Sequence, residues 1–177
     1  MKQTRYTKMI LAAMFLAIGM VLPFLTGQIK TMGETFLPMH LPVMLCGLIC
    51  GWKYGLAVGL LLPPMRSLFF GMPPIYPNAV WMALELGTYG AVAGILYERL
   101  PKKSILWLYG ELICAMLAGR AVWGISKSIL LGVGGKPFTA AAFFAGGFVD
   151  ALPGILLQLI LIPPIVTLAR RMRKNNV

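Results

Sequence analysis

Charged residues are scarce in this chain. They make up 12% of its 177 residues, whereas an average soluble domain carries about a quarter. Apolar residues make up 59%, and the mean hydropathy is +0.81. A chain of this size cannot bury so much apolar surface in one aqueous core. The composition therefore excludes an ordinary soluble domain and predicts an integral membrane protein, with residues 1–177 forming a single domain.

Residue types that commonly act in catalysis or metal binding are also few, since the chain has five acidic residues and a single histidine. The sequence has no His-Glu-x-x-His motif and no Gly-x-Ser-x-Gly elbow. Segment 134–136 (GGK) hints at a nucleotide-binding loop, but Leu130 and Pro137 stand where that loop needs Gly and Ser/Thr. Cys46, Cys50 and Cys114 lie in apolar stretches and are expected to pack as free thiols. We expect no catalytic residue, no metal site and no cofactor bound by this chain.

The net charge of +11 comes from 16 Lys and Arg residues. On a soluble protein this excess would point to nucleic acid. Here the basic residues stand at the chain ends and in short loops between apolar runs, and no aromatic and basic platform for base stacking is present. We therefore expect membrane lipid around the chain and no nucleic-acid partner.

Six apolar stretches are candidates for spanning helices, each of which needs about 20 apolar residues. They cover residues 7–27, 38–51, 54–70, 77–97, 105–133 and 138–169. The second is short, and a turn at Trp52 and Lys53 is expected to divide it from the third. With a cytoplasmic amino terminus, eleven Lys and Arg fall inside and only Lys30 and Lys136 fall outside. This asymmetry predicts an all-α bundle of six transmembrane helices with both termini in the cytoplasm.

Several ionisable residues lie within these apolar stretches. They are Arg66, Glu85, Glu111, Arg120, Lys127 and Asp150. A charge at the bilayer centre costs about 3 kcal/mol, so such residues usually face a cavity or one another. Arg120, Trp123 and Lys127 are spaced three and four apart, which places them on one helical face.

With a rise of about 1.5 Å per residue along each helix, one group of residues from different predicted helices falls at a similar depth in the outer half of the membrane. The predicted substrate-binding residues are Arg66, Asn78, Trp81, Glu85, Arg120, Trp123 and Lys127. Their Arg and Lys side chains could hold an anionic group, the Trp faces could pack against its apolar part, and the Asn could fix its orientation. The three cations outnumber Glu85 and Asp150 by one, which suits a carboxylate or a phosphate.

A structural interpretation of the same charges stays open. The acids and bases could form ion pairs that bind no ligand, Arg120 with Asp150 for instance. The single histidine, His40, is expected to be a hydrogen-bonded structural residue, although an intramembrane enzyme using His40 or Glu85 is a further hypothesis. Ala13 and Ala17 form a small-xxx-small pair, which serves either the docking of another helix or packing within the bundle.

The segments KMILAAMFLA (8–17), PMHLPVMLCG (38–47), GWKYG (51–55), GMPPIYP (71–77) and ELGTYG (85–90) carry a family likeness. Together with the short helices and the missing nucleotide-binding loop, they resemble the substrate-binding S components of energy-coupling factor (ECF) vitamin transporters. Residues 38–90 are similar to the subgroup that includes pantothenate S components.

The resemblance implies a micronutrient importer of a bacterial plasma membrane. The S component would capture a vitamin from outside and dock on a transmembrane T component and two cytoplasmic ATPases, which use ATP. Ala13 and Ala17 would then form the docking face, and residues 28–37 would cap the pocket. Pantothenate, with one carboxylate, suits the surplus positive charge. A pyridoxine-like or other heterocyclic solute, a stand-alone secondary carrier and a non-transporting scaffold remain alternatives.

Overall fold

The computed structural model describes residues 4–26, 35–100, 104–135 and 138–175, and every element in these ranges is helical. The elements are α1 (Arg5–Val21), η1 (Leu22–Thr26), α3 (His40–Cys50), α4 (Trp52–Phe70), η2 (Ile75–Ala79), α5 (Val80–Arg99), α6 (Ile105–Val133), α7 (Ala140–Phe144), η3 (Ala145–Val149) and α8 (Leu152–Asn175). The predicted all-α fold is confirmed for the part of the chain that the structure describes.

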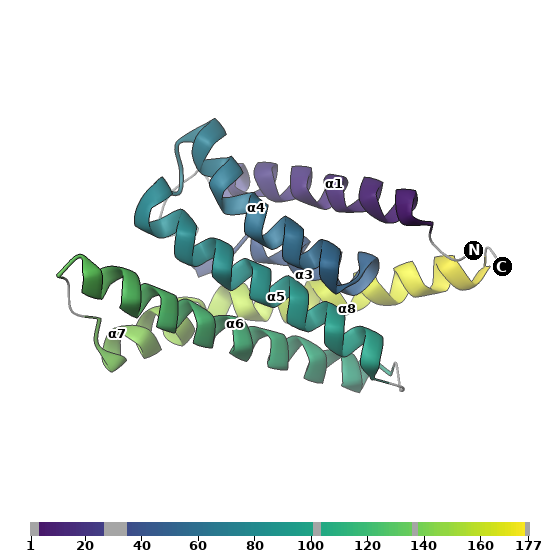
Figure 1. The fold of residues 1–177 in the computed structure, drawn as a ribbon. Helices are drawn as coiled ribbons and strands as arrows, with labels where there is room; N and C mark the ends of the chain where they lie inside the picture. The colour runs from purple at the N-terminus through teal and green to yellow at the C-terminus, as the bar shows by residue number, and fades with distance from the viewer. Residues whose placement is uncertain (1–3, 27–34, 101–103, 136–137, 176–177) are drawn as a thin grey trace.

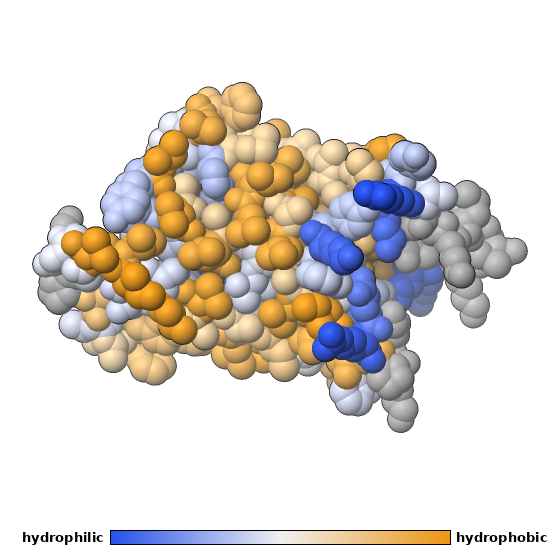
Figure 2. Space-filling model, viewed as in Figure 1, coloured by the Kyte–Doolittle hydropathy of each residue, from blue (hydrophilic) through white to orange (hydrophobic). Residues whose placement is uncertain are grey.

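The long helices lie side by side and alternate in direction, so that the start of α1 and the end of α8 meet at one end of the bundle (Figure 1). The most hydrophilic side chains gather at that same end, while the rest of the visible face is largely apolar (Figure 2). Arg5 and Lys8 at the start of α1 and Arg170 near the end of α8 lie at this end of the bundle. This segregation is the pattern expected of the cytoplasmic end of a membrane protein.

In the part of the chain that the structure describes, four helical segments are long and apolar enough to cross a membrane, namely Arg5–Leu25, Ile75–Arg99, Ile105–Val133 and Ala140–Met172. Helix α3 has 11 residues, which is short for a span, and α4 falls outside these four segments. The chain is thus a multi-pass helical protein. The count of six spans and the cytoplasmic location of both termini stay predictions.

Helices α3, α4 and α5 cross at glycines, which allow close contact of their backbones. A Cβ on Gly47 or Gly55 would overlap with the carbonyl oxygen of Gly90. The turn expected at Trp52 and Lys53 is wrong in its position, because both residues lie in the first turn of α4. Gly51 alone divides α3 from α4, and its φ of 105° is a backbone conformation that glycine adopts without strain.

The largest buried cluster joins α3, α5, α6 and α8. Its members include Met44, Tyr89, Leu112 and Ile162, all less than 2% exposed. Helix α1 contributes much less, because only 17% of its apolar window is buried. The core therefore lies among α3 to α8, and α1 packs against it through α3 and α4.

Candidate functional site

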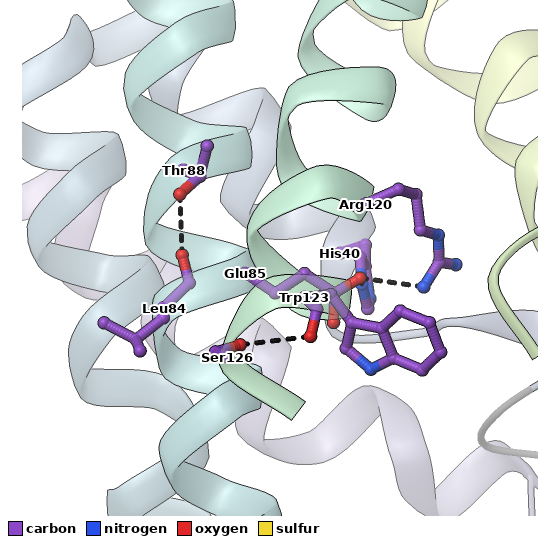
Figure 3. Close-up of polar contacts among 7 residues, drawn as sticks. All are labelled: His40, Leu84, Glu85, Thr88, Arg120, Trp123 and Ser126. Carbon is purple, nitrogen blue, oxygen red and sulfur yellow. Dashed lines mark hydrogen bonds and ion pairs between the residues drawn. The ribbon is translucent and has the colours of Figure 1, made fainter. Parts of the chain in front are cut away.

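Helices α5 and α6 run antiparallel, and their polar side chains meet. The Nη1 of Arg120 donates to Glu85 Oε1 at 2.8 Å, and the Nε2 of His40 lies 3.3 Å from the same oxygen. Figure 3 shows Arg120 reaching across to Glu85, with the Trp123 indole beside the guanidinium. One carboxylate oxygen therefore links α3, α5 and α6.

This polar group is almost completely enclosed. Glu85 is 2% exposed, His40 2% and Arg120 4%. The His40 ring also contacts the Tyr89 ring edge-on, at 5.0 Å between centroids. The expectation that His40 is a hydrogen-bonded residue is confirmed. The pairing suggested for Arg120 with Asp150 is wrong, since Glu85 is the acid that Arg120 contacts.

Some buried polar atoms of this group have no hydrogen-bond partner among the described residues. Arg120 Nε and Nη2 and His40 Nδ1 are buried and bond to no described residue. A buried donor without an acceptor costs about 1–3 kcal/mol, and more when it is charged. With Nε2 donating to Glu85, the Nδ1 of neutral His40 is an acceptor. The site can therefore offer two guanidinium donors and one imidazole acceptor to a bound solute.

Lys127 follows Arg120 by about two helical turns on α6, and aromatic rings surround it. Its Nζ stands 4.5 Å from the Trp123 centroid, 5.4 Å from that of Trp81 and 5.3 Å from that of Phe138. Cation–π attraction of this kind contributes about 0.5–2 kcal/mol. The predicted shared face of Arg120, Trp123 and Lys127 is confirmed, because the Arg120 guanidinium and the Lys127 ammonium both stand over the Trp123 ring. Phe138, which sequence reasoning missed, completes the surround.

Three charged side chains are described in this part of the molecule. Arg120 and Lys127 supply two positive charges and Glu85 one negative charge, while His40 is counted as neutral. Asp150 is exposed, in the turn between η3 and α8, and makes no ion pair with any residue that the structure describes. Both cations lie beside the Trp123 ring, Arg120 at 5.7 Å and Lys127 at 4.5 Å from its centroid.

Arg66 lies elsewhere in the bundle. Its Nη1 donates to the carbonyl of Met20 in the last turn of α1, where helix carbonyls carry partial negative charge. Its guanidinium also stands 5.2 Å from the Phe24 ring and 5.5 Å from the Phe70 ring. The described contacts tie α4 to α1 and do not bring Arg66 to Glu85. Its role in binding a solute stays a prediction.

The remaining predicted site residue and the cap are less defined. Asn78 is half-buried in η2, one turn before Trp81. Residues 27–34, most of the predicted cap, lie outside the described residues, as do Lys30 and Lys136. Beyond them, a Cβ on Gly154 would lie 2.7 Å from the Thr35 carbonyl oxygen, so this segment packs on the start of α8. The pocket open to the outside stays a prediction.

Ala13 and Ala17 are both exposed on α1. Apolar side chains surround them on the surface, among them Ile10 at 63% and Met14 at 54% exposure. The two alanines therefore do not pack within the bundle, which was one of the two interpretations of their spacing. They are free to meet a partner helix or lipid.

Comparison with known proteins places these observations in a family. The family model of the ECF transporter substrate-specific component matches residues 7–166. No curated protein sequence and no solved structure gives a significant match. The matched range contains the two exposed alanines and all the residues of the Glu85–Arg120 contact, and it covers most of the chain. The chain therefore belongs to the family of substrate-specific components of ECF transporters.

Proposed function

We propose that this chain is the solute-capture subunit of an ATP-driven importer and that it binds a small carboxylate in its outer half, with pantothenate as the best match. The observation that carries this proposal is Arg120, which is 4% exposed and has two nitrogens without a described partner. Buried guanidinium donors favour a bound acceptor, because a donor left without one is costly to bury. A carboxylate would satisfy them.

The neighbouring side chains suit the rest of such a solute. Trp81 and Trp123 are 8% and 7% exposed and offer aromatic faces to an apolar chain, as the walls of ligand sites commonly do. Lys127 supplies a second cation above the Trp123 ring. One carboxylate on a short apolar body with polar groups fits this set, and pantothenate has that character. Membership of the pantothenate-like subgroup rests on the segments of residues 38–90.

The partners follow from the family and from what the sequence lacks. The sequence has no nucleotide-binding loop, so ATP hydrolysis falls to two cytoplasmic ATPases, and a transmembrane T component would receive the exposed Ala13 and Ala17 face of α1. The chain itself is then a transport subunit with no catalytic residue. The membrane would be the plasma membrane of a bacterium, with the basic end of the bundle on the cytoplasmic side.

Reconstitution in liposomes tests this function. We expect radiolabelled pantothenate to enter vesicles that contain the chain, a T component, the ATPases and internal ATP, and to stay outside when the ATPases or ATP are omitted. Unlabelled pyridoxine serves as a competitor, and inhibition by it would instead favour a heterocyclic solute. Uptake by the chain alone would contradict the proposal and favour a secondary carrier.

A further inference from the structure

Gln158 is a buried amide on α8 that none of the contacts above uses. Its side chain is 1% exposed, and neither its Nε2 nor its Oε1 bonds to a described residue. Burying an amide without partners costs about 1–3 kcal/mol. A leucine at this position would avoid that cost in the same apolar surroundings. An unsatisfied glutamine at the core is thus a feature that packing does not explain.

The fold brings Gln158 to a depth similar to that of the polar group of α3 and α6. Helix α8 packs against both of these helices. Gly154, one turn before Gln158, lies against the backbone of Phe36, and His40 follows Phe36 by four residues. One turn after Gln158, Ile162 shares a buried cluster with Tyr89, whose ring contacts His40. Gln158 therefore lies at a depth similar to that of His40.

Two separate sets of unsatisfied polar atoms thus occur in one region. Arg120 and His40 provide one set, and the Gln158 amide provides the other. They come from α3, α6 and α8, and no hydrogen bond joins the two sets in the described residues. Each of these atoms is costly to bury without a partner, and one polar group that reaches both sets would lower that cost. A polar solute can provide that group.

We infer that Gln158 is a specificity-determining residue that binds a neutral amide or hydroxyl group of the solute whose carboxylate Arg120 binds. A glutamine side chain offers two donors and an acceptor. It can therefore donate to the carbonyl of a secondary amide and accept from its N–H, or it can bind a hydroxyl. A buried group of this kind rejects analogues that lack the matching polar group. The substrate class is then a small carboxylate that also carries an amide or a hydroxyl. This inference rests on the proposed function.

Gln158→Leu tests the assignment in two measurements on the purified full chain in detergent. The first is the thermal unfolding midpoint without added solute, and the second is equilibrium binding of radiolabelled pantothenate. Thr167→Val is the matched control, because Thr167 is a half-buried polar residue of the same helix whose hydroxyl donates to the Pro163 carbonyl at 2.7 Å. Its bond is internal to α8 and its loss should not affect the solute.

We expect Gln158→Leu to unfold at the same temperature as the wild type or higher, and to bind pantothenate at least tenfold more weakly. Thr167→Val should bind it as the wild type does. A lower unfolding midpoint for Gln158→Leu, or unchanged affinity, overturns the inference. If the wild type itself fails to bind pantothenate, the substrate choice of the proposed function fails, and the unfolding comparison still decides whether the Gln158 amide is bonded within the fold.

Discussion

A single guanidinium, that of Arg120, organises the polar centre of this bundle. It donates to Glu85 across the α5–α6 contact, and Glu85 in turn contacts His40 at the start of α3. In an apolar interior the desolvation of two charges offsets much of their attraction, so the pair is a weak source of stability by itself. The Arg120–Glu85 pair instead positions the guanidinium, because it holds the remaining Arg120 donors beside Trp123.

Breaking the pair at one side should destabilise the protein more than removing both charges. Arg120→Met leaves the Glu85 carboxylate buried without its cation, which typically costs about 3–5 kcal/mol. Arg120→Met with Glu85→Leu removes both charges and should recover most of that loss. Thermal unfolding in detergent measures the three proteins. A double variant less stable than Arg120→Met would show that the two residues do not act as a pair.

Spacing along the helices was enough to predict some of these residues and not others. The three- and four-residue steps from Arg120 to Lys127 correctly placed their shared face, because one α-helix fixes it. The choice of Glu85 over Asp150 as the partner of Arg120 was out of reach, since it depends on how α5 and α6 pack. Gln158 gave no signal at all, because a lone glutamine in an apolar run is ambiguous without its neighbours.

Close backbone contact holds α3, α4 and α5 together. Gly90→Ala should lower the unfolding temperature, because the new methyl group would overlap with the Gly55 carbonyl, and overpacking of this kind costs about 1–3 kcal/mol. Gly110→Ala on α6 is the control, since a Cβ there meets nothing within 4 Å. It should be neutral or slightly stabilising, as alanine is the better helix former. Equal effects of the two changes would contradict the crossing described.

Helix α1 presents its small residues outward, and this exposure leads to a separate prediction. Ala13→Trp and Ala17→Trp should abolish ATP-dependent uptake in the reconstituted system while leaving solute binding by the isolated chain unchanged, because a bulky side chain keeps a partner helix at a distance. Ala121→Trp, on the exposed side of α6, is the matched control. Full uptake with both α1 variants would remove these alanines from the docking face.

The hydropathy pattern predicted the positions of the helices closely, but it did not predict where a helix is interrupted. The apolar stretch predicted for residues 105–133 coincides with α6 (Ile105–Val133), because length and composition alone determine it. The stretch predicted for residues 138–169 is broken by η3 (Ala145–Val149), where Gly146 and Gly147 pack against the Trp123 ring. Such a break arises from tertiary contact, which a hydropathy pattern does not contain.

The whole molecule is polarised along its long axis. The most hydrophilic side chains gather at the end where α1 begins and α8 ends (Figure 2), and the Glu85–Arg120 contact is buried between the helices. This division suits a protein that takes up a solute at one face and meets its energising partners from the other. Family membership and the helical fold are established for the chain, while the solute and the orientation in the membrane belong to the proposal.

Mass spectrometry of the small molecules that copurify with the detergent-solubilised chain shows whether the chain captures a carboxylate solute. We expect one carboxylate-bearing solute to be released from the wild type and from Thr167→Val, and much less of it from Lys127→Met, which lacks the cation above the Trp123 ring. Release of no carboxylate from the wild type, or equal amounts from all three proteins, would contradict the capture of a solute at these residues.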